Sequence, residues 1–235
     1  IAATYHPIIN ITTAEISDSF DVFFKPAGYV FAIWGVIYLG LIMDAIYQLL
    51  PANKESRELR SAANWIILGS IANGTWIFLW HYLYIELSLV AMLVLLVSLI
   101  AAYNKLKIGE HSRSIGRMVA VNIPVSIYLG WISVATIANA TIVLDKIGWD
   151  GFGIAGNIWA AIMILIGGVL GVAMLLTKRD IAYSLVLIWA FYGINVMFPD
   201  QQEMNIAIVG SILVLLVFIG IAVMRMLAPH AQAKD

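Results

Sequence analysis

Aromatic and amide side chains recur at helical spacing in three apolar stretches of the chain. Within each stretch they share one arc of a helix that turns about 100° per residue. They are Phe31, Trp34 and Tyr38 in the first stretch, Asn73, Trp76 and Trp80 in the second, and Tyr128, Trp131, Ala135 and Asn139 in the third. An apolar cavity with a few convergent polar groups is typical of a small-ligand site. These residue types therefore favour non-covalent binding by ring stacking and amide hydrogen bonds.

The two asparagines and the tryptophans each have a second interpretation. An unpartnered amide is costly in hydrocarbon, so Asn73 and Asn139 should face a bundle interior, where they either contact a ligand or join neighbouring helices. Aromatic residues at helix ends are typical of the membrane interface. The residues expected in that interfacial belt are Trp65, Trp80, His81, Tyr82, Tyr84 and Trp149. Trp131 lies near the middle of its helix, where an interfacial belt does not account for it.

Catalytic and metal-binding chemistry has little support in the sequence. The apolar stretches contain Asp44 and Glu86, and neither has a histidine or a second carboxylate on the same helical face. We expect Asp44 to be a helix-end residue rather than a proton carrier. The four histidines lack metal-ligand spacing; they are His6, His81, His111 and His230. The last apolar stretch has no lysine for a retinal Schiff base. We predict no catalytic residue and no metal site.

Composition excludes an ordinary soluble domain. The 235 residues are 62% apolar and 11% charged, against roughly 25% charged residues in soluble domains. A formal net charge of −1 offers no basic surface for a phosphate backbone, so we expect no nucleic-acid partner. The chain has no cysteine, which rules out a disulfide framework or a thiol nucleophile.

Seven apolar runs separated by short polar segments predict an all-α, polytopic transmembrane bundle. Most runs approach the ~20 residues that a helix needs to cross about 30 Å of hydrocarbon. The predicted helices cover approximately residues 29–50, 63–81, 87–104, 118–142, 154–177, 181–198 and 205–226. The lipid bilayer is therefore an expected partner of this chain.

The distribution of lysine and arginine predicts the orientation. Eleven of the 13 basic residues fall in alternate loops and the C-terminal tail, whereas Lys25 and Lys146 fall on the opposite side. The positive-inside rule therefore predicts an outside N-terminus and a cytoplasmic C-terminus.

The polar segments also suggest a division of the chain. We expect an extracytoplasmic N-terminal segment, a four-helix part, an outer loop, and a three-helix extension with a tail, at residues 1–28, 29–143, 144–153 and 154–235. Because the chain begins at Ile1 rather than methionine, we also expect a missing upstream piece, which could include an eighth helix.

Three motifs over residues 24–143 resemble those of the tryptophan-rich sensory protein, or translocator protein, family (TspO/MBR). They are Phe24-Lys25-Pro26 followed by Tyr29, Phe31, Ile33-Trp34 and Ile37-Tyr38; then Asn73, Trp76 and Phe78; then Tyr128, Trp131, Ala135 and Asn139. The chain departs from the family pattern in two places: Pro124 does not directly precede Tyr128, and Val143 replaces a frequent tryptophan. The last three predicted helices have no counterpart in the short, five-helix members, so the chain resembles a longer relative.

The resemblance implies binding of a planar hydrophobic molecule, such as protoporphyrin, haem or a sterol-like molecule, by a sensor, carrier or scavenger. Another pigment or a lipid also stays open as the bound ligand. It gives a ligand-binding role to Trp34, Tyr38, Asn73, Trp76, Tyr128, Trp131, Ala135 and Asn139. Stacking of indole and phenol rings on a flat macrocycle is physically reasonable. No histidine lies well inside an apolar stretch, so tight haem ligation is not expected. The resemblance also implies a homodimer.

Two other functions remain open at this point. An accessory subunit of a respiratory or photosynthetic membrane complex would use the aromatic residues structurally, and the glycines from Gly167 to Gly171 would suit internal packing or a partner subunit. An enzyme acting on porphyrin has no support beyond the tryptophans. In each case the expected location is the bacterial cytoplasmic membrane.

Overall fold

The computed structural model describes residues 11–110 and 114–227, and every regular element in these two ranges is helical. The long helices are α3 (Ile33–Leu49), α4 (Arg57–His81), α5 (Ile85–Leu106), α7 (Ile123–Lys146), α8 (Gly156–Lys178), α9 (Ile181–Met197) and α10 (Gln202–Leu227). The short ones are α2 (Thr13–Asp18), η1 (Gly28–Ala32), η2 (Pro51–Asn53), α6 (Ile115–Arg117), η3 (Met118–Asn122) and η4 (Gly151–Gly153). The predicted all-α membrane bundle is confirmed, and each of the seven apolar runs coincides with a long helix.

Six helical stretches in the described ranges are long and apolar enough to cross a membrane. The seventh, α9, has 17 residues and is apolar but shorter. The fourth stretch is longer than predicted, because α6, η3 and α7 form one continuous helical run from Ile115 to Lys146. Its element η3 is a π-turn, in which Ile123 N–H bonds to Met118 O. Pro124 follows directly, and a proline disturbs the regular hydrogen bonds of the preceding turn.

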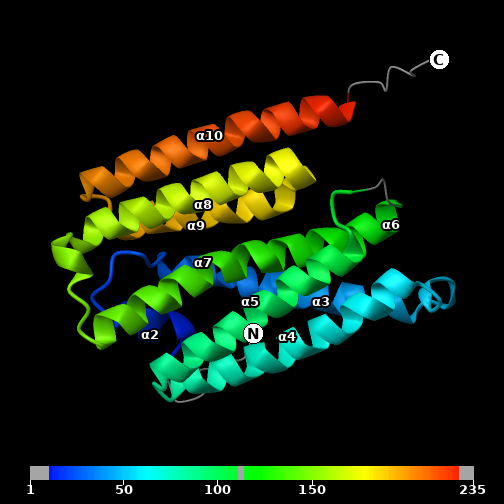
Figure 1. Cartoon of the computed structure of the whole chain (residues 1–235), viewed down its shortest axis with the longest axis horizontal. Coiled ribbons are helices and arrows are strands. Elements are labelled where there is room, and N and C mark those ends of the chain that lie inside the picture. The colour runs from blue at the N-terminus through cyan, green and yellow to red at the C-terminus, as the bar shows by residue number, and fades with distance from the viewer. Residues whose placement is uncertain (1–10, 111–113, 228–235) are drawn as a thin grey trace.

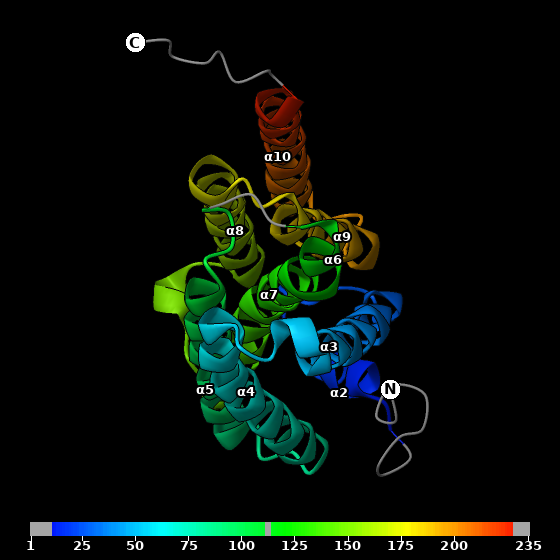
Figure 2. The same cartoon turned by 90° about the vertical axis from the view of Figure 1, so that its right-hand side faces the viewer.

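Helix α7 lies at the centre of the bundle (Figures 1 and 2). It packs against α5, α3 and α9, while α4 pairs with α5 and α8 pairs with α10. Two glycines permit the close contacts of α7. A Cβ at Gly40 of α3 would lie 2.7 Å from Pro124 Cβ, and one at Gly130 would lie 3.0 Å from Tyr183 O in α9. Both α3 and α9 therefore rest directly on α7.

The polar segments gather at the two ends of the bundle. The basic end, at the right in Figure 1, joins α3 to α4, α5 to α6 and α8 to α9. Ion pairs connect its segments, with Arg117 2.7 Å from Glu58 and Lys178 2.8 Å from Glu110. The opposite end joins α4 to α5, α7 to α8 and α9 to α10, and there Lys146 lies 2.9 Å from Glu86. The alternate loops that the charge pattern grouped do share one end.

The Gly167–Gly171 patch packs inside the bundle. A Cβ at Gly168 would lie 2.9 Å from Ser211 Oγ of α10, and one at Gly171 would lie 2.6 Å from Leu215 Cδ2 of α10. Gly167 faces Phe191 of α9 in the same way. These glycines let α8 approach α9 and α10 closely, as small residues do between membrane helices.

Residues 11–28 fold over the end of the bundle where α4 finishes. Thr12 and Glu15 form a reciprocal capping box that starts α2. The Lys25 ammonium is buried and donates to the backbone carbonyls of Asp18 and Phe20, at 3.2 and 2.5 Å. Burial raises the pKa of the Asp18 carboxyl, and the positive charge of Lys25 partly opposes that shift. Residues 11–28 thus form a cover over the bundle that we call the N-terminal cap.

Candidate functional site

The aromatic residues of α3, α4 and α7 meet in one buried aromatic cluster beneath the N-terminal cap. Trp34 is its centre: its ring stacks on Tyr38 and Trp76, with ring centroids 5.5 and 5.9 Å away. The edges of Tyr128 and Trp131 approach Trp34, with centroids at 6.1 and 6.3 Å. Stacked and edge-to-face rings at these distances attract one another. The predicted convergence of the three helical faces is confirmed.

Asn139 joins three helices beside the aromatic cluster. Its Oδ1 accepts from Trp76 Nε1 of α4 at 3.2 Å and from Ser88 Oγ of α5 at 3.2 Å. Its Nδ2 also lies 3.1 Å from Ser88 Oγ. Asn139 is 2% exposed, so these contacts supply the partners that a buried amide requires. In this structure Asn139 bonds neighbouring helices, which is one of the two roles that its sequence left open.

Asn73 makes one weaker contact at the same level of the bundle. Its Nδ2 donates to Tyr38 OH at 3.3 Å, while its Oδ1 is buried without a hydrogen-bond partner. Two further polar atoms of the aromatic cluster are also buried and unpartnered, namely Tyr128 OH and Trp131 Nε1. A buried polar group without a partner costs about 1–3 kcal/mol. Three such groups therefore remain able to pair with a ligand or a water molecule.

The space inside the aromatic cluster is small. A cavity of about 30 Å³ lies among rings from all three helices and reaches Asn139 and Ala135 of α7. The N-terminal cap contributes Ser17 and Pro26 to its wall. This volume suits a water molecule rather than a macrocycle, since one water occupies roughly 30 Å³ in the liquid. The eight predicted ligand-binding residues are brought together, and their rings mostly fill the space that they enclose.

The structure corrects the assignment of Trp80 and His81 to the interfacial belt. Trp80 is 3% exposed, stacks on Trp76 at 5.6 Å and donates through Nε1 to Thr13 O of the N-terminal cap. His81 is fully buried. The belt prediction failed because residues 11–28 cover this helix end. Tyr82 and Tyr84 are exposed as predicted.

Phe31 belongs to the aromatic cluster although it was not among the predicted ligand-binding residues. Its ring meets Trp131 at 5.7 Å, nearly perpendicular to the indole. The sequence carried a signal for this contact, since Phe31 shares the helical arc of Trp34.

Of the two carboxylates that the sequence places in apolar stretches, the structure buries Asp44 and exposes Glu86. Asp44 is buried in the last turns of α3, where its Oδ2 accepts from Gln48 Nε2 at 2.8 Å. Within residues 11–110 and 114–227, no three His, Cys, Asp or Glu side chains are grouped as metal ligands would be. His6, His111 and His230 lie outside the described residues.

Asp180 is a buried carboxylate that sequence analysis missed. It caps the start of α9, where its Oδ1 accepts from Tyr183 N–H at 3.0 Å. Its Oδ2 accepts from Tyr103 OH and Ser126 Oγ, at 2.8 and 2.6 Å. An aspartate directly before an apolar run is a recognisable N-cap signal. The contacts with Tyr103 and Ser126 join residues far apart in the chain and had no such signal.

Comparisons with known proteins agree with the aromatic motifs. No curated protein and no solved structure matches this chain. The family model described as TSPO-like protein matches residues 1–223. This match extends beyond the resemblance over residues 24–143 and takes in α8, α9 and most of α10. With a helical bundle suited to a membrane and an aromatic cluster from three helices, the chain belongs to the TSPO-like protein family.

Proposed function

We propose that this TSPO-like membrane protein binds a planar hydrophobic ligand, of which a tetrapyrrole is the leading case, at the aromatic cluster. It would act there as a sensor, a carrier or a scavenger. The observation that carries the proposal is the pair of buried, unpartnered polar atoms Tyr128 OH and Trp131 Nε1, on rings that meet Trp34 edge to face. A ligand with a flat apolar face and a polar edge would stack on the rings and pair with the two polar atoms at once.

Binding of a macrocycle requires the rings to separate, because the closed cavity holds only about 30 Å³. The N-terminal cap forms one part of the cavity wall, through Ser17 and Pro26. Two hydrogen bonds attach the cap to the bundle, from Trp80 Nε1 to Thr13 O and from Ala27 N–H to Gly193 O. A ligand would exchange the stacking of Trp34 on Tyr38 and Trp76 for stacking on the ligand.

A second function from another class is favoured by the closed packing itself. As an accessory subunit of a larger membrane complex, or as a homodimer, the protein would use the aromatic cluster as an ordinary hydrophobic core. The hydrogen bonds of Asn139 to α4 and α5 support this structural role.

The variant Tyr128→Phe separates the two functions. It removes an unpartnered hydroxyl and keeps the ring, so the free energy of unfolding should stay the same or rise. If the hydroxyl serves a ligand, affinity for protoporphyrin IX should fall about three- to tenfold in a titration in mild detergent, followed by quenching of tryptophan fluorescence.

Tyr183→Phe is the matched control. Its hydroxyl is already bonded to Ser133 Oγ at 3.0 Å and lies in α9, so its loss should lower stability and leave protoporphyrin affinity unchanged. Absence of saturable quenching in the unmodified protein would overturn porphyrin binding and favour the structural role. A cofactor-free complex of constant composition in native membrane extracts would support that role directly.

We further propose the bacterial cytoplasmic membrane as the location, with the basic end of the bundle in the cytoplasm. The lysines and arginines of the loops gathered at that end support this orientation. Because the chain lacks cysteine, a single cysteine at exposed Arg60 or Tyr84 would report the side by labelling with an impermeant maleimide in intact cells. Labelling at Arg60 but not at Tyr84 would reverse the orientation.

A further inference from the structure

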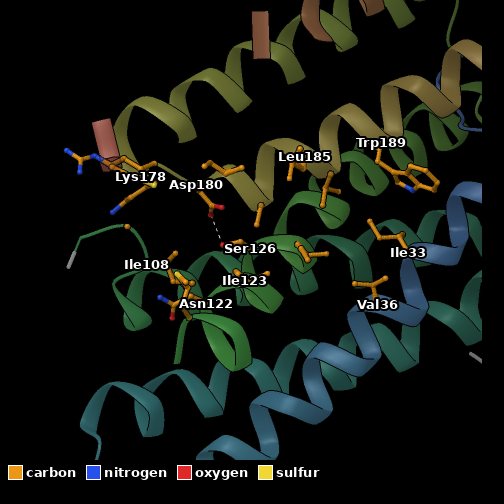
Figure 3. A pocket seen from close by; sticks show the side chains of 18 of the residues that line it. Ile33, Val36, Ile108, Asn122, Ile123, Ser126, Lys178, Asp180, Leu185 and Trp189 are labelled. Atoms are coloured by element: carbon orange, nitrogen blue, oxygen red, sulfur yellow. Dashed lines mark hydrogen bonds between the residues drawn. The ribbon is translucent and has the colours of Figure 1, made fainter. Parts of the chain in front are cut away.

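A groove of about 990 Å³ lies outside the aromatic cluster, on the other side of α3 (Figure 3). Helix α7 forms its floor, and α3 and α9 form its two walls. Its volume is near the upper limit of the roughly 300–1,000 Å³ of known small-ligand pockets. This lateral groove is lined by residues that include Ile33, Val36, Ile123, Leu185, Val186 and Trp189.

The lateral groove is closed at one end, where the residues just before α3 are bonded to α9. Trp189 Nε1 donates to Val30 O at 3.2 Å, and Ala27 N–H donates to Gly193 O at 3.0 Å. From Trp189 and Ile33 the two helices separate toward Lys178 and Asp180, as Figure 3 shows. The groove therefore runs from a closed, apolar end to the basic end of the bundle.

The length of the groove matches one leaflet of a bilayer. Ile181 and Trp189 both line it and are eight residues apart on α9. This interval corresponds to about 12 Å at 1.5 Å per residue. Half of the hydrocarbon core of a bilayer measures about 15 Å. An extended acyl chain that entered at the basic end would reach Trp189 without crossing the membrane midplane.

Polar groups are confined to the basic end of the groove. Lys178 is neutralised by Glu110 at 2.8 Å, and both oxygens of Asp180 already accept bonds from Tyr103, Ser126 and Tyr183. Arg179 is exposed and makes no ion pair or hydrogen bond with the described residues. Asp180 keeps its negative charge, because its three partners are uncharged, but it is buried and its oxygens are occupied. Among the described residues at this mouth, Arg179 is therefore the exposed charge that is free to pair with an anion.

We propose that the lateral groove is a binding site for a phospholipid with an anionic headgroup. One acyl chain lies along α7 between α3 and α9, and the phosphate pairs with Arg179 at the mouth. The apolar walls, the leaflet-matched length and the unpaired cation each favour this occupant over a soluble molecule. The site is separate from the aromatic cluster, so it stands whether or not a tetrapyrrole binds there.

Quenching of Trp189 by lipids with brominated acyl chains tests this site. Trp189 is 37% exposed at the closed end of the groove, and the difference from Trp189→Phe isolates its signal among eight tryptophans. The protein is reconstituted in phosphatidylcholine vesicles that contain increasing amounts of brominated phosphatidylglycerol or brominated phosphatidylcholine. We expect quenching by the anionic lipid to saturate at a lower mole fraction.

Two variants change the site in different ways. Arg179→Gln should raise the mole fraction of phosphatidylglycerol at half-saturation about fivefold, as expected for one basic residue at an anionic surface. Ala182→Phe fills the groove and should abolish the saturable component. The matched controls are Arg60→Gln at the same end and Ala173→Phe on an exposed face of α8, and both should behave as the unmodified protein.

Other outcomes overturn the proposal. Equal, unsaturated quenching by both lipids would mean that Trp189 meets only bulk lipid. No quenching by either lipid would mean that another partner covers the groove. If Ala182→Phe alters the helix content, the response of Arg179→Gln, which changes only an exposed side chain, still decides the matter.

Discussion

The aromatic cluster and the lateral groove lie on two sides of α3. In each of them, the space available is the opposite of what the side chains suggest. The cluster has the rings and amides typical of a ligand site, yet its cavity measures about 30 Å³. The groove is mostly aliphatic and has about 990 Å³ of space. Residues that suit ligand binding and space that accepts a ligand are therefore separate in this protein.

The physical reason lies in packing. Flat rings that face one another stack and fill their own cavity, as Trp34 does with Tyr38 and Trp76. The groove exists because α9 is bonded through Trp189 to η1, which leads into α3, and from there α3 and α9 diverge above the floor of α7. The space between α3 and α9 therefore follows from the way the two helices diverge.

The largest expected effect on stability is the loss of a ring in the packed aromatic cluster, compared with the loss of a ring at the open edge of the groove. Trp131 is 2% exposed, so Trp131→Ala should lower the free energy of unfolding by about 3–5 kcal/mol. Trp189→Ala at the edge of the groove should lower it by no more than about 1–2 kcal/mol, because that ring is partly exposed already. Unfolding in a mild detergent with increasing denaturant, followed by circular dichroism, compares them.

A similar decrease in the free energy of unfolding for both tryptophan variants would contradict this contrast, since the groove would then be as tightly packed as the cluster. Tyr82→Ala, which removes a ring that is 56% exposed at the end of α4, provides a baseline for the loss of an exposed aromatic side chain.

A smaller effect is expected from the buried carboxylate in the wall of the groove. Asp180→Ala leaves Tyr103 OH, Ser126 Oγ and Tyr183 N–H without their acceptor, and should lower the free energy of unfolding by about 1–3 kcal/mol. The same denaturant unfolding measures it, and Asp145→Ala, an exposed carboxylate, is the control. An unchanged stability would indicate that Asp180 serves a groove ligand rather than the fold.

The smallest effect concerns the N-terminal cap that closes the aromatic cluster. Hydrogen bonds from the Thr12 backbone and side chain lower the pKa of the Glu15 carboxyl below its usual 4.5. The capping box therefore contributes its full stability above pH 4.5, and this contribution is lost as the pH falls through the lowered pKa of Glu15. Burial raises the pKa of Asp18, so its contribution to stability has the opposite pH dependence. The contribution of Asp18 is present at low pH and is lost as the pH rises through its raised pKa.

Trp80 reports on this cap because its indole bonds to Thr13 O. Its fluorescence, isolated by subtraction of Trp80→Phe, should change on acidification below about pH 4.5. Glu15→Gln keeps the capping geometry but should remove this pH dependence. A transition that persists in Glu15→Gln and vanishes in Asp18→Asn would assign it to Asp18 instead.

Much of the fold could be predicted from the chain alone. Seven apolar runs of nearly membrane-spanning length fixed the helices, because hydrocarbon leaves a backbone few alternatives to an α-helix. Helical periodicity also placed Trp34, Trp76, Trp131 and Asn139 on faces that do meet. Their ligand-binding role stays a prediction.

Three features were decided only by tertiary structure. The N-terminal cap buries Trp80, Asp180 finds Tyr103 and Ser126 from distant helices, and α3 and α9 diverge over α7. Each depends on contacts between segments far apart in sequence, which periodicity within one segment cannot specify. The sequence thus determined which side chains face inward, and the crossing of the helices determined whether a packed core or an open groove lies between them.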